Sequence, residues 1–209
     1  MIAIIDYGMG NLYSVSKALE RMNVAYILSS NEAELEKADG YILPGVGSFK
    51  DAMTILNETG LTSFIHKIVV EGKPLLGICL GMQLLFEESD ENGFSIGLGL
   101  LPGKVIKLPE GTREAPLKVP HMGWNSLLIK NESPLLADLS GEHAYFVHSY
   151  YVKTDEEDTL LATADYGVEV PAVVGRGHVF GTQFHPEKSS DLGLSILKNY
   201  IKFVEGEGR

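Results

Sequence analysis

The chain has 209 residues, 44% hydrophobic and 22% charged, which is typical of a globular domain with a sizeable core, and its one cysteine excludes a disulfide framework or a cysteine-rich zinc site. Its 28 Asp and Glu residues against 17 Lys and Arg give a net charge of −11, which argues against nucleic acid as the main partner because phosphate binding needs a basic surface. No apolar run approaches the ~20 residues of a membrane span and the N-terminal residues MIAIIDYGMG lack the basic start of a signal peptide, so we expect a cytoplasmic protein.

The first part of the chain alternates short apolar runs with helical patterns. Ile2–Asp6 is an apolar run followed by a glycine-containing turn, and Leu12–Met22 has its apolar residues on one helical face. Further strand-like runs lie at Val24–Leu28, Tyr41–Leu43 and Leu75–Cys79, with helical patterns between the last two at Ser48–Leu56 and Leu61–Val70. This alternation predicts βαβ units and a parallel sheet covered by helices.

Beyond about residue 95, strand-like runs separated by short polar turns predominate. They lie at Val105–Leu108, Ser126–Ile129, Ala144–Val152, Leu160–Tyr166, Val170–Val174 and Val179–Phe184. Only Ser190–Val204 shows a clear helical stripe, and we interpret the acidic clusters Glu87–Glu91 and Asp155–Asp158 as solvated faces or loops. The sequence therefore predicts an α/β fold, a single domain over residues 1–209 whose mixed, largely parallel central sheet is flanked by helices, with added antiparallel strands in the C-terminal half.

The single cysteine lies where a strand is expected to meet a helix. The segment Gly77-Ile78-Cys79-Leu80-Gly81 has the pattern of a nucleophile elbow, in which a sharp turn exposes the nucleophile and the flanking glycines avoid clashes. Such a turn directs the N–H of Leu80 and a helix N-terminus at the sulfur, which favours a thiolate and a developing oxyanion. The alternative is that Cys79 is an ordinary buried apolar residue.

A cysteine nucleophile needs a base, and the base needs an orienting group. His185-Pro186-Glu187 supplies both at the end of a strand-like run. Proline keeps His185 out of the helical region, and in an extended segment residues i and i+2 point to the same face. We therefore expect Glu187 to bind one imidazole nitrogen of His185 while the other faces Cys79. A solvated turn is the alternative for this tripeptide taken alone.

The segments Gly77–Gln83 and Gly181–Ser189, which contain these two patterns, resemble the class I glutamine amidotransferase family, whose members hydrolyse the side-chain amide of glutamine and pass the ammonia to a partner. Further segments are similar to the members that serve a (β/α)8-barrel cyclase in histidine biosynthesis, and the likeness covers essentially the whole chain. These segments are Ile5–Leu12, Pro44–Phe49, Pro120–Asn125 and Tyr145–Tyr150.

The resemblance assigns roles to residues of this sequence. It implies a catalytic triad of Cys79, His185 and Glu187, and an oxyanion hole formed by the N–H groups of Val46 and Leu80. It implies glutamine binding by Gly47, Gln83, Ser149 and Tyr150. It implies a heterodimer with the cyclase subunit and no metal or cofactor. Residues near the expected edge of the site, and of types found at interfaces, are predicted to meet the partner: Asn11, Trp124, Asn125, Tyr145 and Lys188.

Several alternatives remain open from the sequence. The chain could be a free-standing cysteine hydrolase, a non-catalytic subunit that has kept the fold, or a sister amidotransferase, although several sister enzymes carry histidine at the position of Met82. Trp124 could be part of the chain's own core. His121, His143 and His148 lack the helical spacing and cysteine partners typical of a metal site, so we interpret them as structural.

Overall fold

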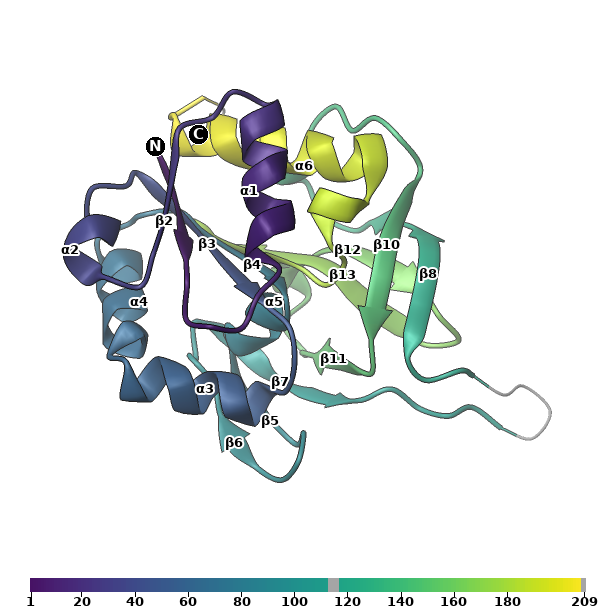
Figure 1. Cartoon of the computed structure of the whole chain (residues 1–209). Helices are drawn as coiled ribbons and strands as arrows, with labels where there is room; N and C mark the ends of the chain where they lie inside the picture. The colour runs from purple at the N-terminus through teal and green to yellow at the C-terminus, as the bar shows by residue number, and fades with distance from the viewer. Residues whose placement is uncertain (113–116, 208–209) are drawn as a thin grey trace.

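The centre of the computed structural model, which describes residues 1–112 and 117–207, is an eight-stranded sheet with the strand order β2-β1-β3-β4-β14-β13-β12-β9 (Figure 1). The pairings from β2 to β14 are parallel, and those from β14 to β9 are antiparallel. The strands are β1 (Ile2–Ile5), β2 (Tyr26–Ser29), β3 (Gly40–Gly45), β4 (Leu75–Cys79), β9 (Leu128–Ile129), β12 (Leu160–Asp165), β13 (Glu169–Arg176) and β14 (Val179–Thr182).

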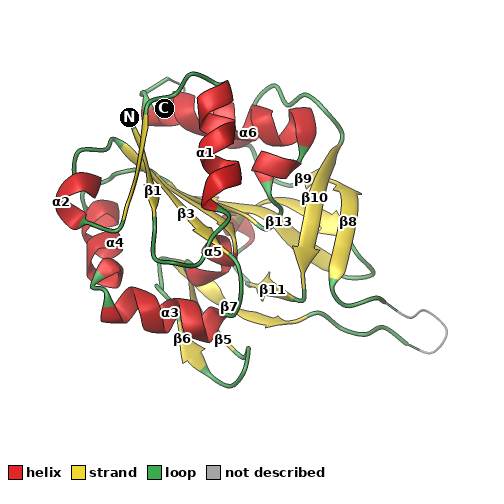
Figure 2. Cartoon of the chain, in the orientation of Figure 1, coloured by secondary structure: helices red, strands yellow, loops and turns green. Residues whose placement is uncertain are grey.

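Helices cover both faces of the parallel half of the sheet, as Figure 2 shows. They are α1 (Leu12–Arg21), α2 (Glu32–Leu35), α3 (Phe49–Glu58), α4 (Leu61–Val70), α5 (Leu80–Leu84) and α6 (Ser190–Val204), with short 3-10 helices η1 (Pro134–Leu136), η2 (Glu157–Thr159) and η3 (Pro186–Lys188). Alternate strand residues enter opposite cores: Ile4 packs with α1 and α6, and Ile5 packs with α3 and α4. Burial on both faces explains why these strands are continuous apolar runs.

Two smaller sheets lie beside the central one. A two-stranded sheet pairs β8 (His121–Ser126) with β10 (His143–His148). A four-stranded sheet has the order β11-β7-β5-β6 and is formed by β5 (Phe86–Ser89), β6 (Ser95–Ile96), β7 (Leu101–Lys107) and β11 (Tyr150–Lys153).

The fold class, a single α/β domain with a mixed sheet, is confirmed, whereas three of the local predictions are wrong or incomplete. The single strand expected over Ala144–Val152 is two strands, because the chain changes its pairing partner from β8 to β7 at Ser149. The acidic cluster Glu87–Glu91 is only partly solvated, since its first three residues lie in β5 and Ser89 is fully buried. The strand predicted at Ser126–Ile129 is not continuous, because β8 ends at Ser126 and β9 begins at Leu128.

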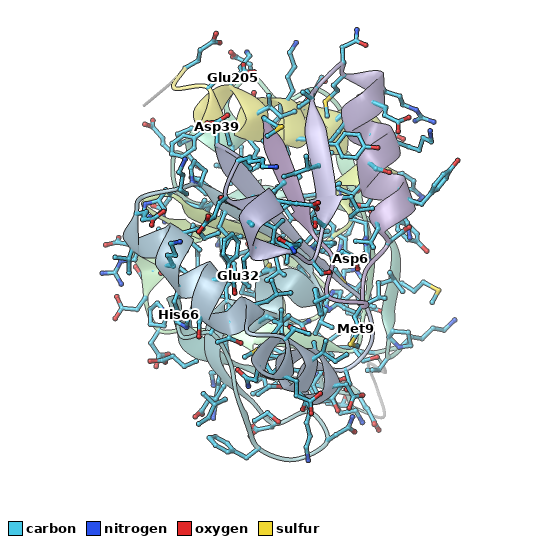
Figure 3. The ribbon with its side chains drawn as sticks, turned by 60° about the vertical axis from the view of Figure 1, so that its left-hand side comes forward. Asp6, Met9, Glu32, Asp39, His66 and Glu205 are labelled. Atoms are coloured by element: carbon cyan, nitrogen blue, oxygen red, sulfur yellow. The ribbon has the colours of Figure 1, made fainter. Side chains whose placement is uncertain are left out.

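Strand β14 decides where the chemistry can occur. Although it comes near the end of the chain, it lies parallel to β4, with Thr182 opposite Ile78. The residues that follow β4 and β14 therefore emerge at the same carboxyl edge of the sheet, where open α/β folds place their sites. Figure 3 labels residues at the two ends of the parallel strands, with Asp6 and Met9 beyond the end of β1 and Asp39 before the start of β3.

Among the helices of the described residues, none combines the length and the apolar character that a membrane crossing requires.

Candidate active site

Cys79 occupies a strained turn between a strand and a helix. It is the last residue of β4, α5 begins at the next residue, and its φ of 55° lies in the left-handed region that non-glycine residues rarely adopt. A Cβ added to Gly81 would lie 1.8 Å from the carbonyl oxygen of Leu43, and one added to Gly77 would lie 2.6 Å from the carbonyl oxygen of Gly81. The predicted strand–turn–helix geometry is therefore present, and both glycines are needed for it.

His185 and Glu187 come together immediately after β14. The imidazole Nδ1 of His185 lies 2.9 Å from the Glu187 Oε1, and both side chains are almost inaccessible to solvent. The segment was expected to stay extended. His185 does so, with φ of −93° and ψ of 99°, but Pro186–Lys188 forms a 3-10 turn. The turn, and not strand alternation, brings the two side chains together.

The pairing of His185 on both sides controls its charge. Burial disfavours the imidazolium, but hydrogen bonds to the Cys79 sulfur and to Glu187 outweigh that effect and raise the pKa of His185 to about 9. Because Nδ1 faces Glu187, Nε2 is the nitrogen left for the sulfur. A cationic imidazole therefore lies beside Cys79 at neutral pH, which favours the thiolate. The arrangement can support attack by sulfur and proton transfer by imidazole.

A pocket of about 360 Å³ opens over Cys79, within the ~300–1,000 Å³ range of small-molecule sites. It brings together Cys79, His185 and every residue predicted for the oxyanion hole or for glutamine, namely Val46, Leu80, Gly47, Gln83, Ser149 and Tyr150. Gln83 reaches the pocket because it lies one helical turn beyond the nucleophile on α5. Ser149 reaches it because the strand break described above places that residue at the pocket wall.

Glu91 also lines this pocket, and the sequence did not single it out. The residue follows β5, and its Oε2 accepts the backbone N–H of Phe49, the first residue of α3, at 2.7 Å. Its half-burial raises the pKa of its carboxyl group, against the lowering effect of the Phe49 N–H. The sequence places Glu91 in an acidic cluster, and its burial depends on the contact with α3, so no local pattern predicts its position. The pocket therefore contains, besides the nucleophile, a carboxyl group whose position is fixed by the Phe49 N–H.

His121 and His148 form a buried pair, and His148 is part of the pocket wall. The His121 Nδ1 lies 3.0 Å from the His148 Nε2, and burial lowers the pKa of each to about 4, so both are neutral at pH 7. The His148 Nδ1 donates to the carbonyl oxygen of Tyr150 at 2.9 Å. His143 is exposed. Within residues 1–112 and 117–207, no group of three or more His, Cys, Asp or Glu side chains is arranged to hold a metal ion.

The residues predicted to meet a partner differ in their surroundings. Trp124 is 54% exposed, which excludes a place in the core, and its ring packs edge-on against Tyr145 across β8 and β10 at a centroid distance of 5.7 Å. Lys188 is exposed in η3. Asn11 caps α1, accepting the Ser14 N–H at 3.4 Å. The half-buried Asn125 side chain donates to the backbone carbonyl oxygen of Asp165 at 2.8 Å.

A larger hollow of about 570 Å³ lies at the opposite edge of the sheet, between the start of β1 and the end of α6. Its lining includes Met1, Met22, Lys198 and Glu205 but no cysteine or histidine. The smaller pocket is therefore the candidate site, because it alone of the two contains a nucleophile and a base.

Comparisons with known proteins find matches over nearly the whole chain. A family model described as glutamine amidotransferase class-I matches residues 3–203. "Imidazole glycerol phosphate synthase subunit HisH" of Geobacillus sp. (strain WCH70) is 63% identical over 209 residues, covering 100% of this chain and 99% of the relative. The protein of the same name from Halalkalibacterium halodurans is 66% identical over 207 residues, covering 98% and 97%. A crystal structure of a glutamine amidotransferase has the same fold, with a TM-score of 0.75, 23% identity and 98% of each chain covered.

Proposed function

The chain belongs to the class I glutamine amidotransferase family, and we propose that it is the glutaminase subunit of an imidazole glycerol phosphate synthase, acting in histidine biosynthesis. It hydrolyses glutamine to glutamate and ammonia and delivers the ammonia to a (β/α)8-barrel cyclase subunit. The cyclase forms imidazole glycerol phosphate and an aminoimidazole carboxamide ribonucleotide. The observation that carries the proposal is the pocket in which Cys79 meets His185, whose Nδ1 is held from behind by the buried Glu187, in a chain that matches its relatives over their full length.

The first half of the reaction releases ammonia. The Cys79 thiolate attacks the side-chain amide carbon of glutamine, and the carbonyl π electrons move to the oxygen. The N–H of Leu80, which lies in the first turn of α5 and so lacks an intrahelical acceptor, donates to that oxyanion together with the N–H of Val46. The imidazolium of His185 then gives its proton to the nitrogen, the C–N bond breaks, and ammonia leaves a thioester on Cys79.

The second half restores the enzyme. Neutral His185 takes a proton from a water molecule, which attacks the thioester carbon and forms a second oxyanion in the same hole. Collapse of this intermediate breaks the C–S bond, releases glutamate and returns the thiolate beside the imidazolium. Glu187 holds the Nδ1–H of His185 in both halves, so that Nε2 always faces the reacting atoms.

Substrate orientation follows from the charges in the pocket. The α-ammonium of glutamine requires an anion, and Glu91 supplies a carboxylate whose Oε2 is fixed by the Phe49 N–H. We assign the α-carboxylate to the part of the wall formed by Gly47, Ser149 and Tyr150, where main-chain groups are available. Gln83 receives the side-chain amide group near the nucleophile.

The partner docks at the mouth of this pocket. Free ammonia is largely protonated near pH 7 and is then not nucleophilic, so it has to pass between the sites without entering bulk water. The exposed Trp124 and the half-buried Tyr145 form an aromatic pair on β8 and β10, and the carbonyl oxygen of Tyr145 accepts the backbone N–H of His185 at 3.1 Å. A docking surface around this pair adjoins the catalytic base. The proposal includes a cytoplasmic location, because a reactive thiol requires a reducing compartment.

The test combines activity with covalent labelling. The purified chain should release ammonia from glutamine when the cyclase and its nucleotide substrate are present, and a glutamine-derived diazoketone should modify Cys79 and abolish that activity. Modification elsewhere, with activity retained, would contradict the proposal. Release of ammonia from peptide or ester amides in preference to glutamine would favour the free-standing hydrolase.

A further inference from the structure

Gln183 is a buried polar residue at the reacting sulfur to which the mechanism above gives no role. It follows β14 and is 0% exposed, and its backbone N–H donates to the carbonyl oxygen of Ala172 at 2.9 Å. Its side-chain Nε2 lies 3.9 Å from the Cys79 Sγ, and its Oε1 lies 3.0 Å from the Nε2 of Gln83. Gln183 therefore bridges the nucleophile and a residue of the pocket wall.

The orientation of both amide groups follows from one backbone carbonyl. The carbonyl oxygen of Tyr150 can only accept, so the side-chain atom of Gln83 that lies 2.9 Å from it has to be the amide nitrogen. The same nitrogen is 3.0 Å from Gln183, so Gln183 has to present its oxygen there and its own nitrogen to the Cys79 sulfur. The contacts thus settle an assignment that amide shape alone leaves ambiguous.

A second donor holds the Tyr150 carbonyl in place. The His148 Nδ1 lies 2.9 Å from the same oxygen, so both of its lone pairs are used. Gln83 in turn uses both protons of its NH₂ group, on Tyr150 and on Gln183. The carbonyl oxygen of Gln83 has no hydrogen-bond partner among residues 1–112 and 117–207, and Gln83 lines the pocket.

The contact between the Gln183 side-chain N–H and the Cys79 sulfur is one that would stabilise a thiolate. The carbonyl oxygen of Val147, 4.0 Å from the Cys79 Sγ, can only accept and so can pair only with a protonated thiol, whereas the Gln183 N–H can donate to the sulfur lone pairs in either state. A buried thiolate without donors is costly, and a hydrogen bond to an ionised acceptor is about twice as strong as a neutral one. An amide N–H is a far weaker acid than a thiol, so it does not transfer its proton to the sulfur. It can only stabilise the thiolate by a hydrogen bond.

We propose that Gln183 is a positioning residue of this site. Its amide N–H donates to the Cys79 thiolate, and its carbonyl oxygen fixes the Gln83 amide so that the Gln83 carbonyl faces the pocket as an acceptor for an N–H donor of the bound amino acid. The second part rests on the proposed function. The first part concerns the thiolate alone and does not depend on glutamine.

The test measures the thiolate directly. The rate of Cys79 alkylation by iodoacetamide is followed against pH in the full chain for the wild type, Gln183→Glu and Gln183→Met. Gln183→Glu keeps an oxygen for Gln83 but presents an acceptor to the sulfur, so its alkylation profile should move to higher pH by about one unit or more, which slows the reaction about tenfold at pH values below the wild-type midpoint. Gln183→Met removes both contacts and should shift the profile in the same direction by less.

A neighbouring residue supplies the control. The hydroxyl of Thr182 is buried in β14 without a hydrogen-bond partner among the described residues, so Thr182→Val changes a buried polar group there while leaving the amide contacts in place. Its alkylation profile should match that of the wild type. An unchanged profile for folded Gln183→Glu, or for Gln183→Met if the former does not fold, would overturn the thiolate role. An unchanged KM for glutamine in Gln183→Met, measured with the cyclase bound, would overturn the role in orienting Gln83. If the wild type shows no glutaminase activity but the alkylation profile shifts as expected, the proposed function fails and the thiolate role stands.

Discussion

Glu91 offers the most discriminating test of how the pocket recognises its substrate. We expect Glu91→Gln to weaken binding of the α-ammonium group of glutamine. The substitution preserves shape and keeps a carbonyl oxygen for the Phe49 N–H, so the start of α3 is retained. Only the negative charge is lost. Asp90→Asn, at the exposed neighbouring position, removes the same unit of charge outside the pocket and serves as the control.

The size of the effect follows from the half-buried position of the carboxylate. Two opposite charges about 4 Å apart attract by about 4 kcal/mol at an effective dielectric constant of about 20, and desolvation of both groups cancels part of this. A hydrogen bond to a charged group is worth about 1.5–3 kcal/mol net. We therefore expect KM for glutamine to rise about 10- to 150-fold, with a smaller change in kcat.

The assay is steady-state ammonia release with the cyclase bound, using glutamine and 4-carbamoylbutanoate, which is glutamine without the α-amino group. Relative to the wild type with glutamine, KM should rise by about the same factor for the wild type with the analogue as for Glu91→Gln with glutamine. Replacing glutamine by the analogue should then raise the KM of the variant little further. Equal impairment of both substrates by Glu91→Gln would refute the reasoning. Because burial raises the pKa of Glu91, KM of the wild type should also rise on acidification, and that rise should be absent in the variant.

Three further predictions follow from the site and its surroundings. Glu187→Gln, which weakens the 2.9 Å contact that orients His185, should lower kcat by about two orders of magnitude or more with little change in KM, and a normal kcat would contradict the role of Glu187. Trp124→Ala should raise the Kd for the cyclase about 30-fold. The free energy of unfolding of the free chain in urea should stay within about 0.5 kcal/mol of the wild-type value, because Trp124 is exposed. Val70→Ala, at another exposed position, is the control, and an unchanged Kd for Trp124→Ala would exclude the docking surface. The folded chain should lose stability as pH falls from about 6.5 to 4, because burial lowers the pKa of His121 and His148 to about 4 and the unfolded chain therefore binds more protons in that range. The free energy of unfolding should fall by an amount on the order of 3 kcal/mol for one such histidine by pH 4. A urea midpoint that does not change between about pH 6.5 and 4 would contradict this. His185 does not contribute to this acid-side loss, because its pKa is raised and its stabilising effect is lost only as pH rises toward about 9.

The local patterns of the sequence predict the nucleophile well because the geometry is encoded locally. Gly77 and Gly81 are required by contacts at 2.6 and 1.8 Å, so the glycine spacing around Cys79 is itself a structural signal. The proximity of His185 to Cys79 is not local, since it depends on β14 entering the sheet beside β4. Periodicity cannot predict strand order. The pairing is predicted instead from the chemistry, because a cysteine nucleophile needs a base and an orienting group, and the family resemblance implies the same triad.

The parts that sequence reasoning missed depend on tertiary contacts. Glu91 belongs to the pocket because the start of α3 captures its carboxylate. Gln183 occurs in a strand-like run, where its burial could be predicted but not its contacts with Gln83 and Cys79. The break at Ser149 is invisible in a continuous run of β-forming residues, because it reflects a change of pairing partner between two sheets.

The central claim is that Cys79 generates ammonia for a synthase subunit, and one measurement tests it most directly. The chain and the cyclase are mixed with the nucleotide substrate, and formation of imidazole glycerol phosphate is followed with glutamine or with ammonium salt, for the wild type and Cys79→Ala. We expect Cys79→Ala to abolish the glutamine-dependent rate and to leave the ammonium-dependent rate intact, since the cyclase needs only the ammonia. Glutamine-dependent synthesis by Cys79→Ala at the wild-type rate would contradict it.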